Sequence, residues 1–177
     1  MNEPPYTIET LEPGRSIGFL VKRCGVLMTR VAERRFATEP VSFTQWFVLA
    51  NLTRFEHVSA TLLSEETGYD MGALTRIVDG LERDGLVRRE RCKHDRRAVE
   101  IAITSEGQRR LQGGKRVLVN LLNELAAPYT RRELDTLIGL MRRMLLRLQE
   151  SDAQAVARPA PEAPRQGAAR GSRGGAK

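Results

Sequence analysis

The sequence has few cysteines and histidines and no long apolar run. Two cysteines, Cys24 and Cys92, are too few for a disulfide framework, and two histidines leave a conventional metal centre short of ligands. No stretch approaches the roughly 18 to 20 apolar residues that a membrane span needs, and the N-terminus lacks the apolar core of a signal peptide. These absences predict a cytoplasmic protein that binds no metal and no membrane.

Motifs of catalysis and cofactor binding are also missing. The chain has no nucleophile elbow, no phosphate-binding glycine loop, no HExxH and no paired acidic motif. We therefore expect neither an enzyme nor a cofactor. A length of 177 residues suits about one globular domain.

Basic charge is what the sequence has in excess. Its 29 Lys and Arg residues outnumber 22 Asp and Glu residues, which gives a net charge of +7. Such an excess favours a polyanionic partner such as nucleic acid or an acidic membrane face, and composition does not choose between the two. Much of this positive charge lies in residues 86–97, which contain six basic residues and two acidic ones, Glu90 and Asp95. This density is typical of a segment that contacts phosphates.

Apolar periodicity and capping residues predict the first helices. A helical period covers residues 15–36, and Ser42 with Gln45 forms a capping box that begins a helix over residues 43–52. The apolar stripe of the first helix includes Cys24, which predicts packing rather than exposure for this side chain.

Two shorter helices follow. Ser59 is the expected N-cap of the third helix and Gly68 its left-handed end, whereas Asp70 begins a fourth helix that ends at Gly85. A tight connection between two such helices is a helix-turn-helix pattern. The fourth helix is then the one that enters the major groove of DNA.

The period changes after the fourth helix. Residues 86–91 and 98–103 have the short alternating character of an antiparallel hairpin, and helix signals resume at Thr104 and continue to Pro128. The expected fold class is therefore mainly α with a small β-hairpin, a winged helix-turn-helix flanked by N- and C-terminal helices. In this arrangement the hairpin reaches a neighbouring minor groove.

A last helix begins at a capping box formed by Thr130 and Glu133. Its apolar side chains repeat every three and four residues, which predicts a partner surface. These side chains are Leu134, Leu137, Ile138, Met141, Met144, Leu145 and Leu148. From Ser151 onward the composition of Ala, Pro, Gly, Arg and Gln predicts a disordered basic tail.

Three segments resemble the MarR family of bacterial transcriptional regulators. They are FTQWFVLANL at 43–52, MGALTRIVDGLERDGLVRRER at 71–91 and DRRAVEIAIT at 95–104. The last fits the family's wing pattern, D-x-R followed after five residues by an aliphatic residue and Thr. The resemblance covers residues 17–148 and implies a ligand-responsive regulator, usually a repressor, that binds double-stranded DNA at a pseudo-palindromic operator.

The resemblance also implies which residues meet DNA. The candidates at the start and on the exposed front of the fourth helix are Met71, Gly72, Ala73, Thr75 and Arg76. Those of the wing are Arg88, Lys93, Arg96 and Arg97, one of the last two held by Asp95. Free N–H groups of Met71 and Gly72 can meet phosphate. Arg76 has a second interpretation, a surface ion pair with Asp79 or Glu82.

A homodimer is the assembly that the resemblance implies, with its terminal helices interlocked. Ile17, Leu20 and Cys24 of the first helix would join the C-terminal apolar stripe in that interface. The expected organisation is a flexible arm over 1–14, dimerisation helices over 15–40 and 105–150, a winged helix over 41–104 and a tail over 151–177.

Small aromatic or phenolic anions are the ligands that the resemblance implies, bound between the dimerisation helices and the winged domain. The candidate residues are Arg15, Lys22, Arg23, Arg30, Phe43, Trp46, Phe47 and His57. For the three aromatic residues of the second helix, core packing is the alternative interpretation.

Two other functions stay open at this point. Cys92 lies between basic residues that favour its thiolate, so Cys92 or Cys24 could make the protein redox-responsive. Peroxide-sensing relatives carry the reactive cysteine nearer the start of the first helix, where this chain has Ile17 and Gly18. A winged helix can also serve as an interaction or RNA-binding module, although this wing lacks aromatic residues for stacking on bases.

Overall fold

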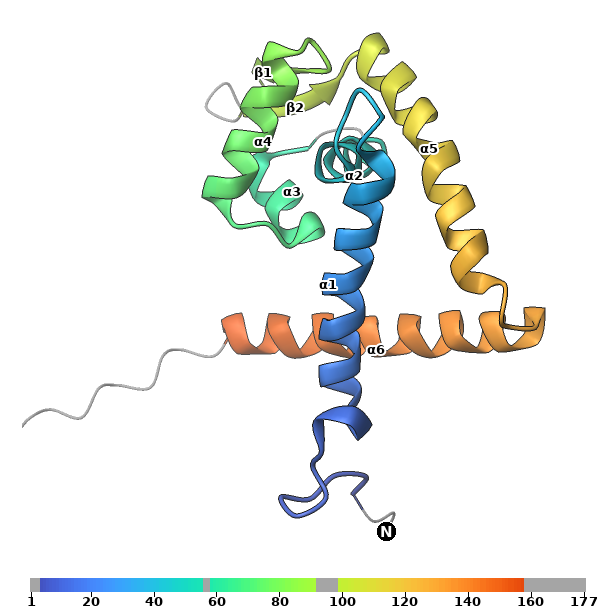
Figure 1. The fold of residues 1–177 in the computed structure, drawn as a ribbon. Coiled ribbons are helices and arrows are strands. Elements are labelled where there is room, and N and C mark those ends of the chain that lie inside the picture. Colours follow the sequence, from blue (N-terminus) through green and yellow to red (C-terminus); the bar gives the residue numbers. More distant parts are fainter. Residues whose placement is uncertain (1–3, 56–57, 92–98, 158–177) are drawn as a thin grey trace, which may run out of the picture. The chain divides into compact units, whose positions relative to one another are not determined.

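A computed structural model describes residues 4–55, 58–91 and 99–157 (Figure 1). Its elements in chain order are η1 (Pro13–Arg15), α1 (Ile17–Phe36), α2 (Phe43–Leu52), α3 (Ala60–Thr67), α4 (Met71–Arg83), β1 (Val87–Arg91), β2 (Val99–Ile103), α5 (Ser105–Ala126) and α6 (Arg131–Ala157). This order confirms the expected fold class, a mainly helical chain with one antiparallel hairpin.

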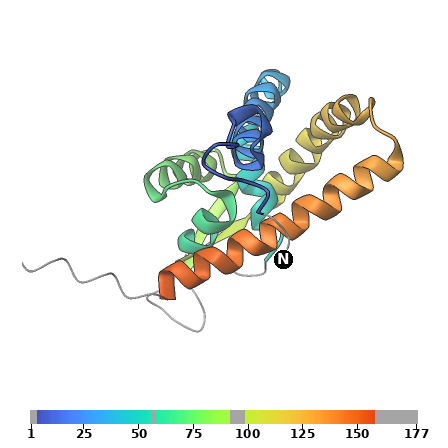
Figure 2. The same cartoon turned by 90° about the horizontal axis from the view of Figure 1, so that it is seen from below.

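The chain divides into two compact units, Met1–Ala127 and Pro128–Lys177. The first unit joins the winged helix, which consists of α2, α3, α4, β1 and β2, to the flanking helices α1 and α5. Viewed along α1, α3 and α4 lie on one side of that helix and α5 lies on the other (Figure 2). The second unit contains α6.

The helices of the winged domain begin at the capping residues that the sequence predicts. Ser42 Oγ accepts the Gln45 N–H at 3.1 Å while Gln45 Oε1 accepts the Ser42 N–H at 3.0 Å, which completes the capping box. Ser59 and Asp70 cap α3 and α4 through single bonds of this kind. Gly68, with φ of 73°, ends α3 in the left-handed region that glycine adopts without strain.

The start of α2 has a second, tertiary cap that comes from α1. The Glu33 carboxylate accepts the N–H of Phe43 at 3.1 Å and the N–H of Thr44 at 2.9 Å. A negative charge at a helix N-terminus is favourable, because free N–H groups carry partial positive charge there. Glu33 therefore fixes α1 against α2.

An aromatic cluster joins α1, α2 and the segment that connects α3 to α4. Phe36 contacts Phe43 edge-on with ring centroids 5.6 Å apart, Trp46 stacks on Phe43, and Phe47 meets Tyr69 edge-on. Phe43 and Trp46 are buried, and Phe47 is partly buried against the same core. Core packing is thus the role that these aromatic side chains have in the structure.

Only the second half of α1 packs against this core. Ala32 and Phe36 are buried and Met28 is partly buried, whereas the side chains near the N-terminus of α1 are exposed. The prediction that Cys24 is packed is wrong for the single chain, where this residue is exposed. The apolar stripe is present, but no element among the described residues of the first unit covers Cys24.

The hairpin is held on both edges. Arg89 and Ile101 lie opposite one another in the register, and their N–H groups point out of the ladder. The Ile101 N–H donates to the Val58 carbonyl at 2.8 Å, and the Arg89 N–H donates to Glu82 Oε1 of α4 at 3.1 Å. Both outer edges of this short sheet therefore have partners.

Helix α5 begins against the base of the hairpin. Thr104 caps α5 and donates its backbone N–H to the Leu86 carbonyl at 3.0 Å. Gly107 lies so close that a Cβ there would be 2.1 Å from the same carbonyl oxygen. This approach requires glycine, and it ties the end of the wing directly to α5.

Helix α6 has the predicted capping box, in which the Thr130 N–H donates to Glu133 Oε2 at 2.7 Å and the Glu133 N–H donates to Thr130 Oγ1 at 3.3 Å. Residues 151–157 are helical, which corrects the prediction that disorder begins at Ser151. The physical reason is that Ala and Gln in this segment are good helix formers, so α6 continues through it.

Candidate nucleic-acid interface

The exposed face of α4 carries the side chains that the sequence assigns to DNA contact. Met71, Gly72, Thr75 and Arg76 are exposed, and Ala73 is half-buried. Leu74, Val78 and Leu81 are buried on the opposite face, and they fix the rotation of the helix about its axis. The Asp70 carboxylate caps the helix by accepting the Ala73 N–H at 2.9 Å.

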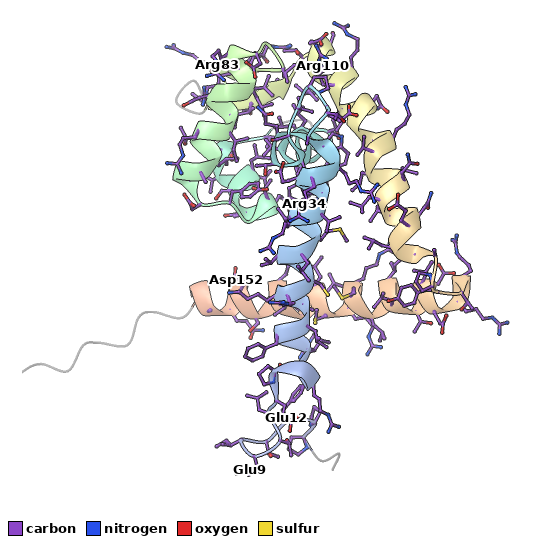
Figure 3. All side chains as sticks on the ribbon, viewed as in Figure 1. Glu9, Glu12, Arg34, Arg83, Arg110 and Asp152 are labelled. Atoms are coloured by element: carbon purple, nitrogen blue, oxygen red, sulfur yellow. The ribbon has the colours of Figure 1, made fainter. Side chains whose placement is uncertain are left out.

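Arg76 has no ion-pair partner in the part of the chain that the structure describes. The interpretation that pairs it with Asp79 or Glu82 is wrong, because both carboxylates bind Arg89 of β1 instead. A shallow groove beside α4 is lined by Arg76 and Arg83 together with side chains from the start of α2. Figure 3 labels Arg83 at the C-terminal end of α4.

Arg83 is a candidate that sequence reasoning missed. It follows Arg76 by seven residues, so the two lie on one face of the helix. Its side chain is 79% exposed, and among the described residues its ion-pair partner is Asp84, at 3.5 Å. The seven-residue spacing between the two arginines is the sequence feature from which Arg83 could have been predicted.

Arg89 links the wing to α4. Its guanidinium donates to Asp79 Oδ1 at 2.5 Å and to Glu82 Oε2. The hydrogen bond that Arg89 donates to Asp79 is the main cause that raises the pKa of Arg89 above its ordinary value, and desolvation opposes it. The two carboxylates thus keep the Arg89 guanidinium protonated, and the three side chains together carry a formal charge of −1.

The structure describes the two strands of the wing, β1 and β2, but not residues 92–98 between them. Arg88 is exposed and pairs with Glu90 on the same face of the strand. The remaining predicted wing residues lie outside the described residues, as do the second cysteine and one ligand candidate. These are Lys93, Asp95, Arg96, Arg97, Cys92 and His57.

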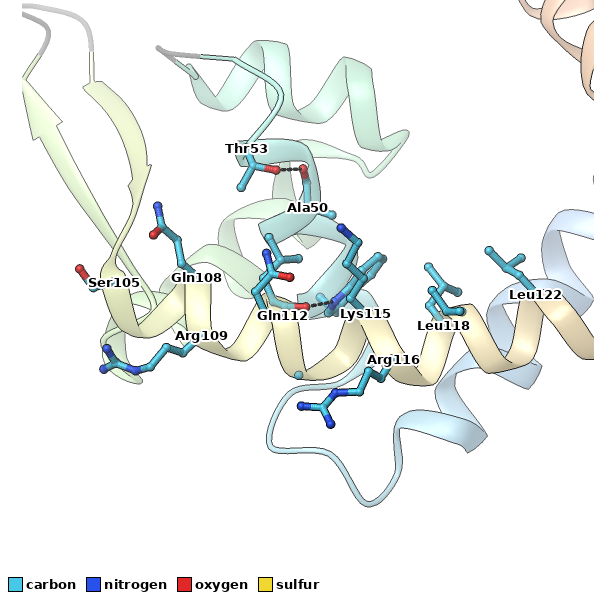
Figure 4. Close-up of a pocket in the computed structure, with 14 residues that line it drawn as sticks. Ala50, Thr53, Ser105, Gln108, Arg109, Gln112, Lys115, Arg116, Leu118 and Leu122 are labelled. Atoms are coloured by element: carbon cyan, nitrogen blue, oxygen red, sulfur yellow. Dashed lines mark hydrogen bonds between the residues drawn. The ribbon is translucent and has the colours of Figure 1, made fainter.

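A groove of about 1010 Å³ lies between α2 and α5 (Figure 4). Trp46, Ala50 and Thr53 line it from α2. The lining residues of α5 are Ser105, Gln108, Arg109, Leu111, Gln112, Gly113, Lys115, Arg116, Leu118, Val119 and Leu122. Figure 4 shows Gln108 and Lys115 on the side of α5 that faces α2, and Arg109 and Arg116 directed away from it.

Of the seven ligand candidates that the structure describes, the groove contains one, Trp46. Arg15, Lys22, Arg23 and Arg30 are exposed on η1 and α1 and do not line it, and neither do Phe43 and Phe47. Lys115 was missed, because its role depends on how α5 packs against α2. Arg109 differs from Lys115 in that Glu106 pairs with it.

No helix among the described residues is long and apolar enough to cross a membrane. In the same residues, no three side chains of His, Cys, Asp or Glu gather in a group that could hold a metal ion.

Comparisons with known proteins give matches for the sequence and the fold. The sequence profile of the MarR family matches residues 40–98. The transcriptional regulator BldR from Sulfolobus solfataricus is 27% identical, with 72% of this chain and 91% of that chain covered and a TM-score of 0.66. A MarR mutant from E. coli, solved with operator DNA, is 25% identical over 73% of this chain and 93% of that chain, with a TM-score of 0.65.

A third structure shows the same fold at lower identity. BpsR from Bordetella bronchiseptica, whose DNA binding is regulated by 6-hydroxynicotinic acid, is 17% identical over 80% of this chain and 97% of that chain, with a TM-score of 0.65. The profile match covers α2, α3, α4 and β1 and ends just before β2, whereas the structural matches cover 72% of the chain or more. Together with the arrangement of α4 and the hairpin, they show that the chain has a winged helix-turn-helix fold and is similar, over residues 40–98 and in fold, to transcriptional regulators of the MarR family.

Proposed function

We propose that this chain is a repressor that binds a pseudo-palindromic operator in double-stranded DNA as a homodimer. The observation that carries the proposal is the exposed face of α4, where Arg76 and Arg83 have no carboxylate closer than 3.5 Å among the described residues. An α-helix fits the major groove, and an arginine can donate two hydrogen bonds to a guanine there. The E. coli MarR mutant solved with operator DNA has a similar fold.

The homodimer is supported by apolar side chains that the single chain leaves exposed. On α1 these are Ile17, Phe19, Leu20, Val26 and Leu27. On α6 they are Leu137, Ile138, Leu140, Met141, Leu145, Leu146 and Leu148. Faces of this kind are covered by a partner in soluble proteins. A second copy would also supply a second α4, as a pseudo-palindrome requires.

A small aromatic anion is the proposed effector. The groove between α2 and α5 offers Trp46, Leu118 and Leu122 to an apolar ring and the ammonium group of Lys115 to a carboxylate. No ion pair occupies Lys115 in the described part of the chain. Regulation of BpsR by 6-hydroxynicotinic acid supports this class of ligand. Binding would release DNA by changing the distance between the two α4 helices.

A gel-shift series on duplex DNA, single-stranded DNA and structured RNA tests the proposal. We expect duplex fragments from the chain's own locus to bind, with an affinity that falls roughly a thousandfold or more between 50 and 200 mM salt if about 6 to 10 phosphates are contacted. Footprints should show two half-sites about one helical turn apart, roughly 10 to 10.5 base pairs. Equal binding of all three nucleic acids, or a single half-site, would contradict the proposal.

A further inference from the structure

Arg89 binds α4 through its side chain and through its backbone. The guanidinium donates to Asp79 and to Glu82, and the backbone N–H donates to the second oxygen of Glu82. Arg89 is the central residue of β1, and both carboxylates lie in the second half of α4. One residue of the wing is therefore bound to two turns of the recognition helix.

The same point of the hairpin is also fixed from the other edge. Ile101 lies opposite Arg89 in the register and donates its N–H to the Val58 carbonyl. A two-stranded hairpin by itself is marginally stable and can change its direction relative to the domain. Hydrogen bonds on both edges of the hairpin at one register position restrict a change of its direction. The hydrogen bonds to α4 are made by Arg89 with Asp79 and Glu82.

We propose that Arg89 is a positioning residue that holds the wing in one direction relative to α4, so that both elements reach a single DNA site together. This inference rests on the proposed DNA-binding function. The Arg89 side chain is 32% exposed, and its guanidinium is bonded to two carboxylates of the same chain. A planar guanidinium can bridge two carboxylates at once, whereas a lysine ammonium is a point charge.

If Arg89 positions the wing, removal of the two carboxylates should weaken binding to the operator. If the carboxylates act only through their charge, their removal should strengthen binding to any DNA. Without Asp79 and Glu82, the DNA face gains positive charge, so binding to any duplex should strengthen. A wing that is no longer fixed should instead lose contacts that only the operator provides. The ratio of operator affinity to random-duplex affinity therefore separates the two effects.

The experiment compares three variants of the full chain, each measured at one salt concentration on an operator selected with the wild-type protein and on a random duplex. The variants are Asp79→Ala with Glu82→Ala, the charge-preserving Arg89→Lys, and a charge-matched control, Glu65→Ala with Glu39→Ala. We expect the ratio to fall about tenfold in the first two, comparable to the loss of one base contact. The control should keep the ratio of the wild type, because neither of its residues bonds to Arg89.

Thermal unfolding shows whether each variant is folded, and Arg89→Lys alone decides the matter if the double alanine variant is not. An unchanged ratio in a folded Arg89→Lys protein would overturn the inference. Wild-type protein that binds no duplex at all would instead overturn the proposed function, so the two failures are distinguishable.

Discussion

The indole N–H of Trp46 in α2 donates a hydrogen bond to the backbone carbonyl of Leu111 in α5 across 2.9 Å. This bond joins a side chain of α2 directly to the backbone of α5. Gly114, one turn further along α5, faces the same indole ring: a Cβ at that position would be 2.4 Å from Trp46 Cδ1 and 2.7 Å from Phe36. The winged helix and α5 therefore meet at a surface that has no room for a methyl group.

Gly114→Ala should destabilise the protein by about 1 to 3 kcal/mol, because the methyl group overpacks the contact with Trp46. Gly113→Ala is the matched control, since a Cβ there has nothing within 4 Å. Alanine at that helical position should stabilise by about 0.4 to 1 kcal/mol. Urea unfolding of both variants measures the difference, and equal free energies of unfolding would contradict this account of the contact.

Arg76→Ala should weaken operator binding by about 1 to 3 kcal/mol if Arg76 reads a base. Arg34→Ala removes the same charge from α1 (Figure 3) and should change operator affinity much less. Fluorescence anisotropy on the operator and on a random duplex measures both affinities. A loss that is equal on the two DNAs would show that Arg76 contacts phosphate and not a base.

Leu145→Glu should weaken the proposed dimer, because it places a carboxylate within the apolar stripe of α6. Gln149→Glu is a matched control: it adds the same charge to α6 at an exposed polar position outside that stripe. Sedimentation should give the wild-type protein and the control twice the chain mass of 19.9 kDa, and Leu145→Glu a smaller value. A wild-type protein that sediments as a single chain would disprove the dimer.

Lys115→Gln should reduce the affinity for 6-hydroxynicotinic acid roughly tenfold, since a hydrogen bond to a charged group contributes about 1.5 to 3 kcal/mol. Arg110→Gln is the control, because it removes a positive charge from a position of α5 that does not line the groove. Calorimetric titration of both variants gives the affinities. The groove would lose its proposed role if the two substitutions had equal effects.

Glu106 gives a prediction that depends on pH. Its hydrogen bond with Arg109, and then the charges of Arg109 and Arg110, lower its pKa below the ordinary value of 4.5. A carboxylate with a lowered pKa in the folded state stabilises the protein above its unfolded pKa, and this contribution is lost as pH falls through the folded pKa. The difference in melting temperature between wild type and Glu106→Gln should therefore be present at pH 7 and vanish in acid. A difference that persisted at pH 3 would have another cause.

Local structure could be read directly from the sequence. Ser42, Ser59, Asp70 and Thr104 begin their helices as the sequence predicts, because a cap involves residues only three positions apart. The buried and exposed faces of α4 also follow from its period. The exposure of Cys24 could not be read in this way, since a stripe shows that a face is apolar and not what covers it.

The amino-acid sequence by itself determined the order of helices and hairpin, the caps and the basic character of the wing, all of which arise within a few residues of one another. Tertiary structure alone decided that Asp79 and Glu82 bind Arg89 rather than Arg76, and that Lys115 rather than a cation of α1 faces α2. These partners come from different elements. Their pairing depends on the angle and distance at which packed helices and strands meet, which no local pattern specifies.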